Sequence, residues 1–85
     1  MRRTSGVPMS ELRALLTDLG FREKRHPSAL VFEHPKEGLV VLRLYQPEDK
    51  VYEGDLRTTR MFLDYRGLLE ASDFDERLHP ASRPA

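Results

Sequence analysis

Residues 28–45 read SALVFEHPKEGLVVLRLY, two apolar runs on either side of a short polar turn. Residues 35–38 have the composition of a hairpin turn, so the flanking runs are expected to pair as antiparallel strands over residues 28–34 and 39–45. The second run is apolar at almost every position. This predicts a central strand that is at least partly covered on both faces.

A stripe of leucines precedes the hairpin. Its members are spaced i, i+3, i+4, i+7 and are Leu12, Leu15, Leu16 and Leu19. This spacing is typical of an amphipathic helix with one buried face. Pro8 suits an early helical position and Gly20 suits the left-handed conformation common just past a helix end, so the helix is expected over residues 9–19.

The chain after the hairpin predicts a third strand and a second helix. Val51 and Tyr52 are expected to form a short edge strand. Apolar residues at helical spacing then predict a helix over residues 55–66, with Asp55 as its N-cap. A capping pattern further on predicts a last helical turn at residues 73–78.

Together these elements predict an α+β fold, a two-layer sandwich. The expected order is α-β-β-β-α, with a three-stranded antiparallel sheet, both helices on one face and a short extra helical turn at the C-terminal end. Because 85 residues are too few for two cores, one domain is expected over residues 9–79, between flexible tails at 1–8 and 80–85. The expected core residues are Leu12, Leu15, Leu16, Leu19, Phe32, Val40, Leu42, Leu56, Phe62 and Leu63.

Composition excludes several kinds of site. The chain has no cysteine, which rules out disulfides and thiolate metal ligands, and its histidines lack the close spacing of a zinc pair. It has no phosphate-binding glycine loop, so neither a metal nor a cofactor is expected. The net charge is zero, which gives the whole molecule no strong attraction to nucleic acid.

The hydropathy pattern predicts a cytoplasmic protein with no membrane partner. The longest apolar stretches, residues 29–32 and 39–42, are far shorter than the roughly 20 residues that span a bilayer. Arg2 and Arg3 at the N-terminus are not followed by the apolar core of a signal peptide.

The order of elements resembles that of the small HicA-type mRNA interferase toxins, which have a double-stranded-RNA-binding-domain-like fold. The resemblance covers about residues 9–78. It rests on the segments 15–21 (LLTDLGF), 28–35 (SALVFEHP), 54–57 (GDLR) and 66–68 (RGL). It implies a toxin–antitoxin system, RNA as a ligand, and an antitoxin-like protein or a second copy of the chain as a partner.

The chain departs from this family at the family's functional signature, a Gly-Ser-His run that enters the first long strand. The corresponding residues here are Pro27, Ser28 and Ala29, so alanine occupies the position of the histidine that is taken to act in RNA cleavage. Alanine can neither donate nor accept a proton, and general acid–base assistance is commonly worth about a hundredfold or more. A degenerate member without efficient cleavage is therefore expected.

Some residues near the lost histidine retain the chemistry to act on RNA. His26 is the candidate for a displaced catalytic base, and an exposed loop histidine is the alternative. Arg22, Lys24, Arg25 and Ser28 are candidates for sequence-independent nucleic-acid contacts. His34, before a turn proline, is expected to structure that turn, and base stacking or a place at the edge of the core is expected for Tyr45, Tyr52 and Tyr65.

Three functional hypotheses follow from these residues. The first is a HicA-like domain that binds RNA or a protein partner without efficient cleavage. The second is an active mRNA interferase that uses His26, and the third is a protein-interaction module with no role in nucleic-acid binding. The neutral net charge and Ala29 favour a binding domain over an enzyme.

Overall fold

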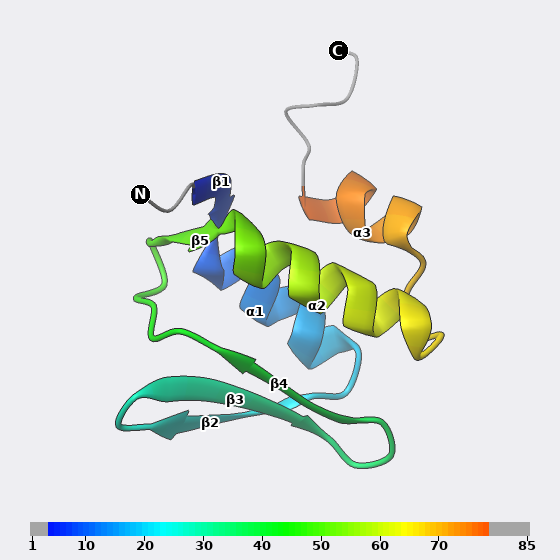
Figure 1. Ribbon diagram of the computed structural model, residues 1–85, viewed down its shortest axis with the longest axis horizontal. Helices are drawn as coiled ribbons and strands as arrows, with labels where there is room; N and C mark the ends of the chain where they lie inside the picture. The colour runs from blue at the N-terminus through cyan, green and yellow to red at the C-terminus, as the bar shows by residue number, and fades with distance from the viewer. Residues whose placement is uncertain (1–3, 79–85) are drawn as a thin grey trace.

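A computed structural model of the chain describes residues 4–78. Its elements are β1 (Thr4–Pro8), α1 (Met9–Asp18), β2 (Arg22–His26), β3 (Ala29–His34), β4 (Gly38–Leu42), β5 (Lys50–Tyr52), α2 (Glu53–Tyr65) and α3 (Ala71–Leu78). The strands form two antiparallel sheets, a larger one in the order β2-β3-β4 and a smaller one of β1 and β5. Figure 1 shows α1 and α2 above the larger sheet, with α3 on the far side of α2.

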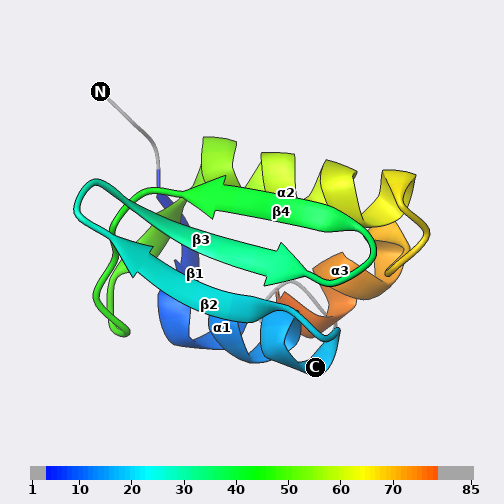
Figure 2. The ribbon, with the colours of Figure 1, turned by 90° about the horizontal axis from the view of Figure 1, so that it is seen from below.

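The alternation of side chains along β3 and β4 determines which face of the larger sheet the helices cover. Leu30 and Phe32 on β3 pair with Leu42 and Val40 on β4, and all four are buried. Seen through the sheet, α2 lies behind β4 and α1 behind β2, so both helices share this face (Figure 2). The predicted α+β architecture, with both helices on one face of a three-stranded antiparallel sheet, is confirmed.

The helices supply the other half of the core. Their buried apolar side chains are Met9, Leu12, Leu15 and Leu16 from α1, Leu56 and Leu63 from α2, and Phe74 and Leu78 from α3. Of the ten residues predicted for the core, all but Leu19 and Phe62 belong to it, and these two are partly buried and pack against it. Two carboxylate–arginine contacts hold α3 in place. Arg60 donates from Nε and Nη2 to the two carboxylate oxygens of Asp75, at 2.8 and 2.9 Å, and Arg77 pairs with Asp18.

The strands of the larger sheet differ from those predicted. Arg22–His26 forms β2 and pairs along its length with β3, so β3 and not the 39–45 segment is the central strand. The prediction that both faces of the 39–45 segment are covered is wrong, because β4 ends at Leu42 and is an edge strand with one bare face. All five residues of β2 are exposed, and an edge strand of this kind gives no apolar alternation in the sequence.

The smaller sheet shows that the prediction of a flexible tail was wrong for residues 4–8. Thr4–Pro8 was expected in a flexible tail but forms β1, and β5 pairs with it and not with the 39–45 segment. The physical reason is burial, since Val7 and Val51 both lie in the core. A side-chain hydrogen bond also joins the two strands, because the Ser5 hydroxyl donates to the Val51 carbonyl at 2.7 Å. The predicted tail at 80–85 lies outside the described residues.

The helix boundaries agree with the predicted ones to within one residue, except that α2 and α3 each begin two residues earlier than predicted. Helix α2 begins at Glu53, and its N-cap is Tyr52, which makes no side-chain capping bond. Asp55 is therefore not the N-cap. It lies in the first turn, where its carboxylate accepts a hydrogen bond from Tyr45.

Two neighbouring valines of β4 test this one-sided sheet. We expect Val40→Ala to lower the free energy of unfolding by about 2 kcal/mol, because Val40 is 4% exposed in the core. Val41 is 55% exposed, so Val41→Ala should cost less than about 0.5 kcal/mol. Urea unfolding followed by circular dichroism measures both. Equal losses would contradict the assignment of the two faces.

Candidate functional site

The face of the larger sheet that carries no helix is the candidate site, and we call it the open face. The strand register assigns eight side chains to it: Arg22, Lys24 and His26 from β2, Ala29, Val31 and Glu33 from β3, and Leu39 and Val41 from β4. The open face is therefore divided by strand. Basic groups lie along one edge, and aliphatic groups lie along the other.

The structure brings three of the five predicted site residues together and separates the other two. Arg22, Lys24 and His26 occupy alternate positions of β2 and share the open face. Arg25 lies opposite Leu30 and so belongs to the helix-covered side. Ser28 lies in the two-residue turn between β2 and β3.

The charged residues of β2 form ion pairs on both faces of the sheet. On the helix side, Glu23 accepts hydrogen bonds from Arg13 of α1 at 2.6 and 3.2 Å, and this ties the edge strand to the helix. On the open face, the Lys24 ammonium lies 3.1 Å from the Glu33 carboxylate. The Arg22 side chain makes no ion pair within residues 4–78, so its charge is the least compensated on the open face.

His26 lies at the end of β2, directly opposite Ala29. A catalytic base needs a partner that orients it and a second group that completes the proton transfer. No hydrogen bond joins the His26 imidazole to another described residue, and Glu33, the carboxylate of this face, is paired with Lys24. The geometry gives His26 solvent access without a catalytic partner.

His34 organises the turn between β3 and β4, as expected from the sequence. Its Nδ1 accepts hydrogen bonds from the backbone N–H groups of Lys36 at 3.1 Å and Glu37 at 3.2 Å. The imidazole also packs edge-on against Phe21, with ring centroids 5.1 Å apart. His34 thereby fixes the turn and joins it to the end of α1.

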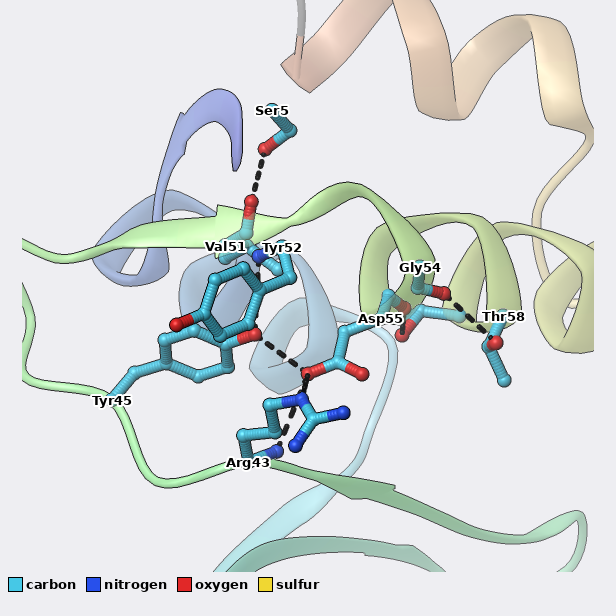
Figure 3. Close-up of polar contacts among 9 residues, drawn as sticks. Ser5, Arg43, Tyr45, Val51, Tyr52, Gly54, Asp55 and Thr58 are labelled. Atoms are coloured by element: carbon cyan, nitrogen blue, oxygen red, sulfur yellow. Dashed lines mark hydrogen bonds and ion pairs between the residues drawn. The ribbon is translucent and has the colours of Figure 1, made fainter. Parts of the chain in front are cut away.

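Sequence reasoning missed a second polar cluster, at the junction of β4 and α2 (Figure 3). The Tyr45 hydroxyl donates to Asp55 Oδ2 at 2.6 Å and accepts the backbone N–H of Tyr52 at 3.1 Å. The same carboxylate oxygen accepts the backbone N–H of Arg43 at 3.4 Å. The Arg43 guanidinium lies 5.6 Å from the centre of the Tyr52 ring, so the cluster fastens the end of β4 to the start of α2.

Burial raises the pKa of Tyr45 far above its ordinary value, and the hydrogen bond to Asp55 raises it further. The phenol therefore stays protonated and acts as a structural donor. Its ring is 4% exposed and cannot stack on a base. Tyr65 is 85% exposed but lies on α2, away from the open face.

Comparison of the chain with protein-family models, with curated proteins and with solved structures gives no match. The HicA-type resemblance stays a prediction from the sequence. None of the helices between residues 4 and 78 is long and apolar enough to cross a membrane. The same residues contain no group of histidine and carboxylate side chains that could hold a metal ion.

The Tyr45 cluster gives a prediction for stability. Tyr45→Phe removes the hydroxyl that donates to Asp55 and accepts the Tyr52 backbone N–H, so we expect the free energy of unfolding to fall by about 1–3 kcal/mol at neutral pH. Tyr65→Phe removes an exposed hydroxyl and serves as the control, with an expected change within about 0.5 kcal/mol.

The stability lost in Tyr45→Phe is expected to depend on pH. The pKa of Tyr45 is raised in the folded protein, so its contribution to stability is complete below the unfolded value of about 10 and is lost as the pH rises above it. The loss is at most about 1.4 kcal/mol per pH unit. Urea unfolding between neutral and alkaline pH should show the gap between wild type and Tyr45→Phe narrowing. A stability difference that stays constant with pH would contradict a raised pKa of the buried Tyr45 hydroxyl.

Proposed function

We propose that this chain is a non-catalytic binding domain of the toxin–antitoxin type that its sequence resembles, and that its open face binds an antitoxin-like protein partner. The observation that carries the proposal is the exposure of Leu39 and Val41, at 50% and 55%, beside a basic strand. Exposed aliphatic groups that lie together on a sheet face favour a surface that another chain covers.

The chemistry of the open face favours protein over RNA. Sheets that bind single-stranded RNA stack the bases on aromatic side chains. None of the seven aromatic residues, which all lie within residues 4–78, is on the open face. The basic groups are confined to β2, and Glu33 compensates one of them. The only basic surface available to RNA phosphates on the open face is therefore the row of side chains on β2.

The division of the open face defines the partner's chemistry. Apolar side chains of the partner would cover Leu39 and Val41, and acidic groups would face Arg22 and Lys24 on the other edge. Such a segment is both acidic and apolar. The ionic half of the contact would weaken with salt, and the apolar half would not.

A second candidate function, RNA cleavage by His26, is supported by one specific observation. His26 pairs across the strands with Ala29, the position that aligns with the catalytic histidine of the resembled family. Side chains directly opposite in an antiparallel pair have Cβ atoms only about 5 Å apart. An imidazole on His26 would thus reach the region that the family's histidine serves.

The binding proposal is tested with the purified protein encoded next to this chain's gene. Isothermal titration of that protein into wild type should give saturable binding, and Val41→Lys should weaken it at least about tenfold because a charge would be buried in the apolar half. Met61→Lys is the matched control, since Met61 is 61% exposed on α2. Absence of binding, or equal weakening by both variants, contradicts the proposal.

RNA cleavage is tested separately with single-stranded and structured RNA. Wild type and His26→Ala are expected to leave both substrates intact, because the described structure offers His26 no catalytic partner. Gel electrophoresis of timed samples gives the readout. Cleavage that His26→Ala abolishes would establish the second candidate. RNA binding that Lys24→Gln weakens, without a protein complex, would make the domain an RNA-binding one.

A further inference from the structure

An open pocket of about 620 Å³ lies at the end of the larger sheet, where α1 leads into β2 and β3 turns into β4. Three of the residues that line it, Arg22, Glu33 and Leu39, form one cross-strand row of the open face. The pocket is therefore continuous with the surface proposed to bind the partner. Gly20 and His34 also line it, and His34 comes from the helix-covered side because it alternates with Glu33 along β3, so the pocket extends around the end of the sheet.

His34 presents a fixed hydrogen-bond donor at this pocket. Its Nδ1 accepts two backbone N–H groups, so a neutral ring must carry its proton on Nε2. A Cβ placed on Gly20 would lie 3.4 Å from Nε2, so this nitrogen lies directly beside the glycine. No described residue accepts a hydrogen bond from it. The absence of a side chain at Gly20 leaves room for an acceptor.

Arg22 supplies a positive charge from the open-face side of the same pocket. Glu33 faces Arg22 across the strands, but its carboxylate lies 3.1 Å from the Lys24 ammonium. Lys24 thus compensates the acid that would otherwise neutralise Arg22. The pocket combines an uncompensated guanidinium, a neutral N–H donor and the apolar side chain of Leu39.

We infer that this pocket binds a carboxylate, held between the Arg22 guanidinium and His34 Nε2–H. Arginine pairs with planar carboxylates through two parallel hydrogen bonds, and a neutral imidazole N–H adds a third donor. The inference rests on the proposed function for the source of the carboxylate, which is an acidic side chain or the C-terminus of the partner segment. The pocket is then the specific part of a contact that is otherwise apolar.

Acetate is the probe that tests the pocket in the free protein. Nitrogen-15 NMR at constant ionic strength should show saturable shifts of His34 Nε2 and Arg22 Nε, with a Kd on the order of 10 mM. Acetamide, the neutral analogue, should leave both signals in place. No shift with acetate, equal shifts with acetamide, or inorganic phosphate binding more than about tenfold tighter than acetate would overturn the carboxylate assignment.

Two arginines of the same strand give matched variants. Arg22→Gln should weaken acetate binding at least about tenfold, whereas Arg25→Gln, on the helix-covered side, should leave it unchanged. Lys24→Gln should also weaken it, because Glu33 would then be free to pair with Arg22. Equal effects of Arg22→Gln and Arg25→Gln would overturn the inference.

Partner-binding measurements distinguish a failure of the pocket inference from a failure of the proposed function. If Val41→Lys weakens partner binding and Arg22→Gln does not, the open face is the partner site and the pocket inference fails. If acetate binds as described and the neighbouring gene product does not, the pocket stands and the proposed partner is wrong.

Discussion

The packing of α1 and α2 against one face of the β2-β3-β4 sheet is the contact on which the rest of the structure depends. Leu30, Phe32, Val40 and Leu42 meet the leucines of the two helices and form most of the core. The helices take one side because the alternation of β3 and β4 places these side chains there. Within residues 4–78 no further helix covers the other side, and the open face is the direct consequence.

The two edges of the larger sheet are chemically different. Every residue of β2 is polar and exposed, and charged edge strands resist unwanted pairing with other sheets. The β4 edge is aliphatic, and its end is fastened by the Tyr45–Asp55 contact and not by more strand pairing. The open face is accordingly basic along β2 and aliphatic along β4. This suits a partner that is acidic on one side and apolar on the other.

The strongly periodic parts of the fold could be predicted from the sequence. The leucine stripe predicted α1, and the runs around residues 35–38 predicted the β3–β4 hairpin, because both elements contribute a regular apolar face to the core. β2 has no such face, so its five polar residues gave no strand signal. β1 was missed because only Val7 of its five residues is buried, which leaves no apolar period to detect.

The candidate site was predictable only in part. The cluster of basic residues at 22–26 was visible, but a loop interpretation could not show that alternation separates Arg25 from Arg22 and Lys24. The Tyr45–Asp55 contact joins residues that lie ten positions apart across an irregular segment, and no local pattern indicates it. The pocket beside His34 depends on the end of α1 meeting the β3–β4 turn, a tertiary contact that the sequence does not encode as a motif.

The most direct measurement of the one-sided sheet is methyl NMR with a soluble paramagnetic gadolinium chelate. In the free protein we expect strong broadening of the Leu39 and Val41 methyl signals, while those of Val40 and Leu42 stay sharp. When the partner is added, the Leu39 and Val41 signals should become protected. Equal broadening of Val40 and Val41 in the free protein would contradict the one-sided sheet, and unchanged broadening of Val41 in the complex would contradict partner binding at the open face.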